Sequence, residues 1–133
     1  MSPGTRFALA VKIDPHPTIH VYAPGAIGYR VVSLLITPQP FVRTLPIQYP
    51  ASEIYFFEPL NERVPVYQKP FTLLQEVVVE VTSEAERALR TQQTLRITGA
   101  LEYQACDDKV CFNPATIPLS WTIALTPNFT RAP

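Results

Sequence analysis

The chain has 133 residues, 47% of them hydrophobic and 17% charged, and its formal net charge is zero. This balance is that of an ordinary globular domain with enough residues to bury a core, and it excludes an intrinsically disordered chain. Zero net charge gives no electrostatic basis for binding nucleic acid or an anionic membrane. The 15 prolines are scattered, which favours many short strands over long helices.

The N-terminal segment MSPGTRFALAVKID has too short an apolar run, and the wrong order of charges, for a secretory signal peptide. No stretch approaches the ~20 apolar residues of a membrane-spanning helix. Taken literally, such a chain would be cytosolic. The tail TPNFTRAP, however, is typical of the start of a linker. We therefore expect residues 1–133 to be a single domain excised from a longer protein.

Alternation of apolar and polar residues is the dominant pattern, and it predicts antiparallel strands with one face on a core. In the first such segment, Phe7, Leu9, Val11 and Ile13 share one face. Prolines and glycines between the segments, Pro46 among them, are expected to separate the strands. The expected strands are 7–13, 19–22, 30–37, 41–45, 53–57, 64–67, 76–81, 95–103 and 119–125.

Only SEAERALRTQQ has a helical pattern, with Ser83 as a possible N-cap and Glu86 three residues later to complete a capping box. This short helix would cross between strands. The elements together predict an all-β, immunoglobulin-like β-sandwich with one short helical crossover. The buried tryptophan and cysteine pair of antibody domains are not matched, because the two cysteines here are nearly adjacent.

The segment YQACDDKVCFNP holds both cysteines of the chain, Cys106 and Cys111. Five steps of extended strand would separate them by roughly 16 Å, whereas a disulfide needs Cα atoms about 4.4–6.8 Å apart. A bond is therefore feasible only if the chain reverses within residues 107–110. Aspartate is a good turn residue, and flanking strands would make this segment the tip of a hairpin near the surface.

From the residues alone, a structural disulfide and a redox-active pair are about equally supported. A loop this short would gain only about 2 kcal/mol from a cross-link, and the hairpin already holds its two arms together. Stability is therefore a weak reason for the pair. A disulfide on an exposed tight turn is also of the type that is more easily reduced.

A zinc site is the third alternative, because the chain has two histidines, His16 and His20, beside its two cysteines. Pro17 prevents the segment HPTIH from forming a helix that would present both rings on one side. In an extended segment their Cα atoms would be roughly 13 Å apart. We therefore expect no metal, and nothing in the sequence indicates a cofactor.

The charges beside the cysteines predict thiols that are not activated. Asp107 and Asp108 disfavour a thiolate at Cys106, and Lys109 offsets them only in part. No helix N-terminus is adjacent, and the spacing is not the C-x-x-C of thioredoxin. Such a pair would act as a relay that exchanges with a partner thiolate. A Ser-His-Asp set, a phosphate loop or a pair of hydrolytic carboxylates is not indicated.

The segment YQACDDKVCFNPATIPLSWTI resembles the active-site hairpin of the N-terminal domain of the bacterial thiol:disulfide interchange protein DsbD. The shared pattern is Y-Q-x-C, a short acidic turn, C-[aromatic]-x-P and a strand that begins near IPL. IHVYAPG resembles the early aromatic strand and loop of this family, and YFFEPLNERVPVYQKPFTL resembles the segment with its cap loop. The likeness covers most of the chain from Ile19 onward.

The resemblance implies an immunoglobulin-like domain in the periplasm, or otherwise outside the cytoplasm, whose Cys106 and Cys111 cycle between disulfide and dithiol. Electrons would arrive from a thioredoxin-like domain, often part of the same longer protein, and leave to a thioredoxin-fold acceptor. The domain would not insert into the membrane itself, although the full-length protein could tether it there. By likeness to the family, Cys111 would form the mixed disulfide and Cys106 would resolve it.

The same resemblance implies a cap loop that covers the cysteines until a partner docks. Phe57, Glu58, Pro59 and Leu60 would form this loop. The residues expected around the disulfide are His20 and Tyr22 beneath the loop, and Tyr103 and Phe112 beside the cysteines, where they would limit access of water.

Three departures from the family pattern stand out. Leu60 replaces an aromatic cap residue, His20 replaces the first ring of an aromatic pair, and Phe112 begins a Phe-Asn-Pro segment where Tyr-Pro-Pro is usual. In the alternative interpretation, Phe56 or Phe57 is a core residue of its strand, and Tyr103 and Phe112 are only packing residues. The chain would then be a non-catalytic β-sandwich binding module with a structural disulfide.

Overall fold

The computed structural model describes residues 6–80, 84 and 94–124. This part of the chain forms strands in three sheets and one short 3-10 helix, η1 (Glu58–Leu60). The strands are β1 (Arg6–Ile13), β2 (His20–Tyr22), β3 (Ser33–Ile36), β4 (Val42–Gln48), β5 (Glu53–Phe57), β6 (Glu62–Tyr67), β7 (Phe71–Val79), β8 (Thr94–Tyr103), β9 (Ala105–Cys106) and β10 (Ala115–Ala124).

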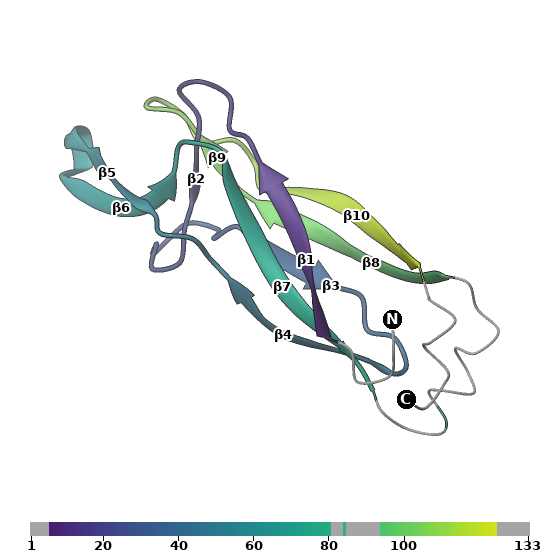
Figure 1. Cartoon of the computed structure of the whole chain (residues 1–133). Coiled ribbons are helices and arrows are strands. Elements are labelled where there is room, and N and C mark those ends of the chain that lie inside the picture. Colours follow the sequence, from purple (N-terminus) through teal and green to yellow (C-terminus); the bar gives the residue numbers. More distant parts are fainter. Residues whose placement is uncertain (1–5, 81–83, 85–93, 125–133) are drawn as a thin grey trace.

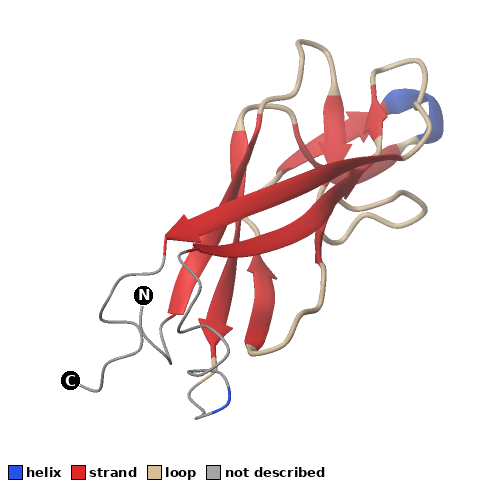
Figure 2. Ribbon diagram, turned by 90° about the vertical axis from the view of Figure 1, so that its right-hand side faces the viewer, coloured by secondary structure: helices blue, strands red, loops and turns tan. Residues whose placement is uncertain are grey.

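Two three-stranded antiparallel sheets, β1-β7-β4 and β10-β8-β3, form the body of the domain (Figures 1 and 2). Alternate side chains of β1, β7 and β8 meet in a core cluster, in which Leu9, Val77 and Ile97 are buried. Burial of each such side chain stabilises the folded state by about 1.5–3 kcal/mol. The predicted alternation and all-β class are confirmed. The predicted helix at 83–93 lies outside the described residues except for Glu84.

The third sheet, β5-β6-β2-β9, has four strands and lies at one end of the sandwich (Figure 1). Its central strand β2 is only three residues long, and all three are buried. Val21 of β2 packs into a second core cluster with Leu73 and Leu101 of the sandwich. Tyr22 packs instead with Val66 and residues near it. This sheet is therefore attached to the main core through one face, on which Val21 lies with Tyr67 of β6 and Ala105 of β9.

Proline 46 does not end a strand, contrary to the prediction. It lies inside β4, which continues to Gln48, and the pairing of β4 with β7 shifts register between Thr44 and Ile47. Proline has no N–H to donate to a ladder, and such a bulge removes the need for one.

Other strand bounds also differ from the prediction. The strands expected at 76–81 and 119–125 are the later parts of β7 and β10, and the strand expected at 30–37 is confined to Ser33–Ile36. The short strand β9 was not predicted. No helix in the described part of the chain is long and apolar enough to cross a membrane.

Gly99 is required by the close approach of two strands. It lies within β8, opposite Ile36 of β3 and Leu119 of β10. A Cβ atom at this position would lie 2.5 Å from the backbone carbonyl oxygen of Leu35. This contact is too close for real structures, and a backbone atom cannot move aside without disturbing the sheet.

We predict that Gly99→Ala lowers the free energy of unfolding by about 1–3 kcal/mol, because overpacking outweighs the entropic advantage of alanine. Denaturant unfolding of the purified domain measures this. Arg96→Thr, at an exposed position of the same strand, is the control and should change stability by about 0.5 kcal/mol or less. Equal or greater stability of Gly99→Ala would contradict the prediction.

Candidate functional site

Cys106 and Cys111 form a disulfide, with their Cα atoms 4.0 Å apart. Cys106 is the last residue of β9, and Cys111 pairs with it through an isolated antiparallel bridge. The chain therefore reverses within residues 107–110, as the spacing of the cysteines required.

The turn between the cysteines has its own hydrogen bonds. The Asp107 side chain accepts hydrogen bonds from the backbone N–H groups of Lys109 and Val110, both at 2.7 Å. The Asp107 N–H donates to the Val110 carbonyl at 2.9 Å, and the Phe112 N–H donates to the Ala105 carbonyl at 2.9 Å. The two backbone donors also hold the pKa of Asp107 below its usual value. The turn thus has hydrogen bonds of its own in addition to the S–S bond.

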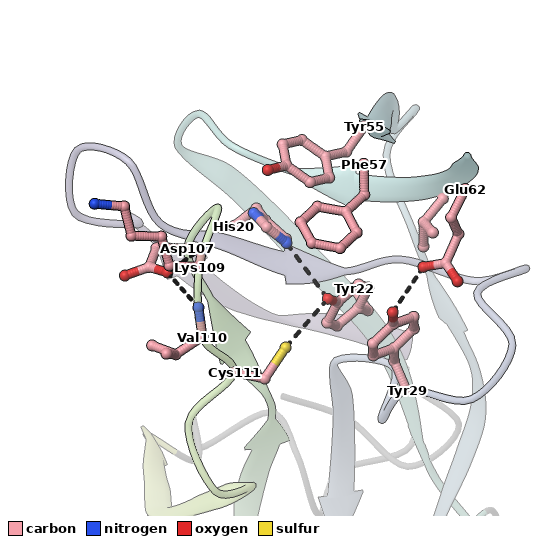
Figure 3. Close-up of a pocket in the computed structure, with 11 residues that line it drawn as sticks. His20, Tyr22, Tyr29, Tyr55, Phe57, Glu62, Asp107, Lys109, Val110 and Cys111 are labelled. Atoms are coloured by element: carbon pink, nitrogen blue, oxygen red, sulfur yellow. Dashed lines mark hydrogen bonds between the residues drawn. The ribbon is translucent and has the colours of Figure 1, made fainter. Parts of the chain in front are cut away.

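The two sulfur-bearing residues differ strongly in exposure. Cys106 is only 1% exposed and belongs to a core cluster with Tyr22, Val64 and Val66. Cys111 is exposed and lines a pocket of about 180 Å³ at the end of the domain (Figure 3). A group that enters this pocket can reach Cys111, whereas Cys106 is shielded by its neighbours.

Tyr22 is the residue in closest polar contact with the disulfide. Its hydroxyl donates to Cys106 Sγ at 3.2 Å and lies 3.6 Å from Cys111 Sγ. Its ring stacks on Tyr29, with centroids 4.0 Å apart, and Tyr29 in turn donates to Glu62 at 2.6 Å. Burial raises the pKa of Tyr22 well above its usual value. The hydroxyl therefore keeps its proton and serves as a donor to sulfur.

His20 is buried in the same pocket, with 3% of its surface exposed. Its Nε2 lies 3.4 Å from the Tyr22 hydroxyl, and its ring packs on Tyr55 with centroids 4.3 Å apart (Figure 3). Burial lowers the pKa of His20, and the charge of Asp107 opposes this effect in part. His20 and Tyr22 thus lie near the disulfide, where the resemblance placed them.

Of the expected cap loop, only the first residue reaches the pocket. Phe57 is half-buried and lines the pocket, and its ring lies across the pocket from Cys111 (Figure 3). The next three residues form η1, which ends at Asn61 in the left-handed conformation, with φ of 48°. Glu58, Pro59 and Leu60 are all exposed and do not line the pocket.

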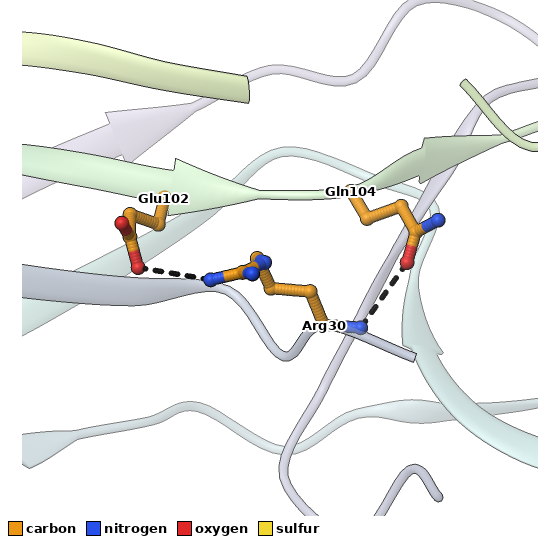
Figure 4. A network of polar contacts seen from close by, with 3 residues as sticks. All are labelled: Arg30, Glu102 and Gln104. Atoms are coloured by element: carbon orange, nitrogen blue, oxygen red, sulfur yellow. Dashed lines mark hydrogen bonds and ion pairs between the residues drawn. The ribbon is translucent and has the colours of Figure 1, made fainter. Parts of the chain in front are cut away.

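Tyr103 and Phe112 do not line the disulfide pocket. Both face a separate, mostly apolar groove of about 610 Å³. Gln104, between Tyr103 and the first cysteine, accepts from the Arg30 backbone N–H at 3.1 Å and donates to the Phe112 carbonyl at 3.4 Å. Arg30 also pairs with Glu102 at 3.3 Å (Figure 4). These contacts connect the loop before β3 to the base of the hairpin.

Three polar residues that line the pocket were not predicted from the sequence, namely Tyr29, Tyr55 and Glu62. Tyr55 could have been found, because it lies two residues before Phe57 on the same strand and so shares its face. Tyr29 and Glu62 have no such local signal. Their position depends on how the loop after β2 and the start of β6 pack together.

Both sulfurs are engaged in the disulfide and are not free to ligate an ion. Among residues 6–80, 84 and 94–124, there is no group of three or more histidine, cysteine, aspartate or glutamate side chains placed to hold a metal. The two histidines are also separated, because His16 is exposed and faces the groove while His20 is buried in the pocket.

The fold is similar to that of a solved domain, described as the crystal structure of the Neisseria meningitidis DsbD N-terminal domain in the reduced form. The TM-score is 0.55 and the sequence identity 13%, over 86% of this chain and 80% of that chain. This likeness supports the predicted immunoglobulin-like sandwich. No curated protein sequence matches this chain.

The sequence profile of one family, described as thiol:disulfide interchange protein DsbD, N-terminal, matches residues 1–120. The match includes both cysteines, the strand that carries His20 and Tyr22, and the segment around Phe57. The chain therefore belongs to the family of the DsbD N-terminal domain.

Proposed function

We propose that this thiol:disulfide interchange domain relays electrons from a thioredoxin-like donor to an extracytoplasmic acceptor through Cys106 and Cys111. The observation that carries the proposal is the asymmetry of the disulfide. One sulfur is buried against a hydroxyl donor, and the other belongs to an exposed residue at an open pocket. A purely structural cross-link has no need of this arrangement.

Reduction of the domain begins at Cys111. A partner thiolate attacks Cys111 Sγ, the S–S bond breaks, and its electron pair remains on Cys106 Sγ as a thiolate. The Tyr22 hydroxyl already points at that sulfur, and a hydrogen bond to an anion is stronger than one to a neutral atom. The partner's second thiolate then attacks the partner sulfur of the mixed disulfide and releases Cys111. The domain is left with both sulfurs reduced, and the partner with a disulfide.

Transfer to the acceptor is the reverse sequence. Cys111 as a thiolate attacks the acceptor disulfide, and Cys106 then attacks Cys111 Sγ, which releases the reduced acceptor. Near the sulfurs the pocket has Lys109 but also the carboxylates of Asp107 and Glu62. These charges do not favour a free thiolate, which suits a relay that reacts with partners rather than a strong oxidant.

The hairpin geometry supports reversible cycling. The S–S bond closes a loop so short that it contributes only about 2 kcal/mol in the chain-entropy model. The turn has four hydrogen bonds of its own, two to the Asp107 side chain and two between backbone groups. We therefore expect the fold to persist when the disulfide is reduced.

Docking of a partner would take place at the end of the domain that carries the pocket. Phe57 covers part of the pocket, and the apolar side chains of Leu60 and Val110 are 65% and 53% exposed. A thioredoxin-like protein that displaces Phe57 would gain access to Cys111. We further propose that the domain works outside the cytoplasm, as part of a longer protein.

The second candidate is a binding module with a structural disulfide. The observation in its favour is the groove of about 610 Å³, whose lining is mostly apolar and includes the half-exposed ring of Phe112. Exposed apolar surface of this kind often marks an interaction site. The redox behaviour of the disulfide separates the two candidates.

The equilibrium potential of the Cys106–Cys111 disulfide is the decisive measurement. We predict a value in the range of the thioredoxin family, above the roughly −300 mV typical of structural disulfides. Thiol trapping in dithiothreitol redox buffers gives the potential, and circular dichroism follows the fold in both states. A much lower potential, or loss of the fold on reduction, would favour the binding module.

The roles of the two cysteines are tested with Cys106→Ala and Cys111→Ala. We predict that Cys111, free in the first variant, forms a mixed disulfide with an oxidised thioredoxin-fold protein at least about tenfold faster than Cys106 does in the second, because only Cys111 is accessible. Non-reducing gels against time measure the two rates. As a control, both variants should show the same number of free thiols after denaturation, so that only accessibility differs between them. Faster capture of Cys106 than of Cys111 would reverse the assignment.

A further inference from the structure

His20 is a buried titratable group beside the disulfide, and the exchange steps above do not use it. It lies directly opposite Cys106 in the pairing of β2 with β9. Because cross-strand partners extend from the same face of a sheet, its ring lies on the side of the sheet that carries the buried sulfur. A histidine that served only for packing would not need a polar path to that sulfur.

Such a path exists through one hydroxyl group. His20 Nε2 lies 3.4 Å from Tyr22 Oη, and the Tyr22 hydroxyl donates to Cys106 Sγ at 3.2 Å. Because the single proton of Tyr22 points at sulfur, the contact with His20 is satisfied when Nε2 carries a proton and donates to the Tyr22 oxygen. His20, Tyr22 and Cys106 thus form one chain of hydrogen bonds, and its orientation is toward the sulfur.

Several elements around the pocket contribute titratable side chains near His20. The titratable side chains lining it together with His20 and Cys111 are Tyr22, Tyr29, Tyr55, Glu62, Asp107 and Lys109. In the oxidised domain burial lowers the pKa of His20, and the charge of Asp107 opposes this effect in part. A new negative charge on Cys106 would change this balance, because opposite charges within about 4–6 Å favour each other's ionised forms.

We propose that His20 is a positioning residue that takes up a proton when Cys106 becomes a thiolate, and so makes the exchange dependent on pH. This inference rests on the proposed function. When a partner thiolate attacks Cys111, the electron pair of the S–S bond moves to Cys106 Sγ. His20 takes one proton from the solvent, and the imidazolium polarises the Tyr22 hydroxyl that donates to the thiolate. The buried anion is thereby neutralised at the moment it forms.

The proton is returned when the cycle is reversed. As Cys106 attacks Cys111 Sγ to restore the disulfide, its electron pair enters the new S–S bond and the anion disappears. His20 then loses its proton to the solvent. No oxidant or reductant is needed beyond the partner thiols and disulfides of the exchange itself.

The test follows the two histidine rings by NMR against pH, in the oxidised and in the reduced wild-type domain. We expect His20 to bind its proton about tenfold more tightly in the reduced domain, because the Cys106 thiolate stabilises the imidazolium. The exposed His16 faces the groove, not the disulfide pocket, so its ring is an internal control in the same spectra.

A kinetic measurement adds a readout that packing alone would not change. The measured quantity is the rate at which dithiothreitol reduces the disulfide, divided by the fraction of dithiothreitol that is thiolate at each pH. This corrected rate should rise about tenfold as pH falls through the pKa of His20, because protonated His20 stabilises the leaving Cys106 thiolate. The His20→Phe variant keeps a ring against Tyr55 but has no titratable nitrogen. Its corrected rate of reduction should therefore not vary with pH. His16→Phe should behave as the wild type.

The outcomes separate this inference from the proposed function. A disulfide that is reduced reversibly, together with an unchanged His20 titration or a flat wild-type rate profile, would overturn the inference alone. If the domain unfolds on reduction, both the exchange function and the role of His20 are overturned. The titration uses the wild-type chain, so the inference remains testable even if His20→Phe does not fold.

Discussion

The pairing of β2 with β9 is the interaction on which the site depends. It consists of only two residue pairs, His20 with Cys106 and Val21 with Ala105. Because neighbouring residues of a strand face opposite sides, Val21 enters the main core while His20 and Tyr22 face the disulfide pocket. One three-residue strand thus anchors the site to the sandwich and supplies the groups that contact the buried sulfur.

The same pairing explains why the two sulfurs are not equivalent. Cys106 belongs to β9 and is therefore covered by the side chains of β2 and β6, with Tyr22, Val64 and Val66 around it. Cys111 follows the turn and is exposed. A disulfide between a buried and an exposed cysteine has a defined point of attack and a defined leaving group. In the proposed exchange, burial sets the order of the chemistry more directly than local charge does.

The surroundings of the disulfide are mostly aromatic, with few charges. Tyr22, Tyr29, Tyr55 and Phe57 line the pocket. Tyr22 donates to the sulfur of the buried Cys106, and a hydrogen bond to a buried atom is stronger than one in water. The carboxylate of Asp107, next to Cys106 in the chain, is engaged by two backbone N–H groups of the turn. The turn former that seemed to oppose a thiolate is thus mainly a structural group, and the hydroxyl of Tyr22 dominates the environment of Cys106.

The class of fold and the place of the cysteine pair on a turn followed from local patterns in the sequence. Alternation in segments such as Phe7–Ile13 predicted the strands, because the two-residue period is a local property of extended chain. The spacing of Cys106 and Cys111 required a turn between them, because covalent geometry permits no other route to a bond. Family resemblance added His20, Tyr22 and Phe57, which the structure brings together in one pocket.

Tertiary packing, by contrast, sets which sulfur is buried and which neighbours reach it. Tyr29 and Glu62 join the site through a loop and a strand end that no local pattern connects. Tyr103 and Phe112 lie beside the cysteines in sequence but face a different groove, and Pro46 is accommodated by a bulge instead of ending its strand. The physical reason is the same in each case. Periodicity and bond geometry act between residues close in the chain, whereas burial and side-chain contacts depend on segments that meet only when the sheets pack together.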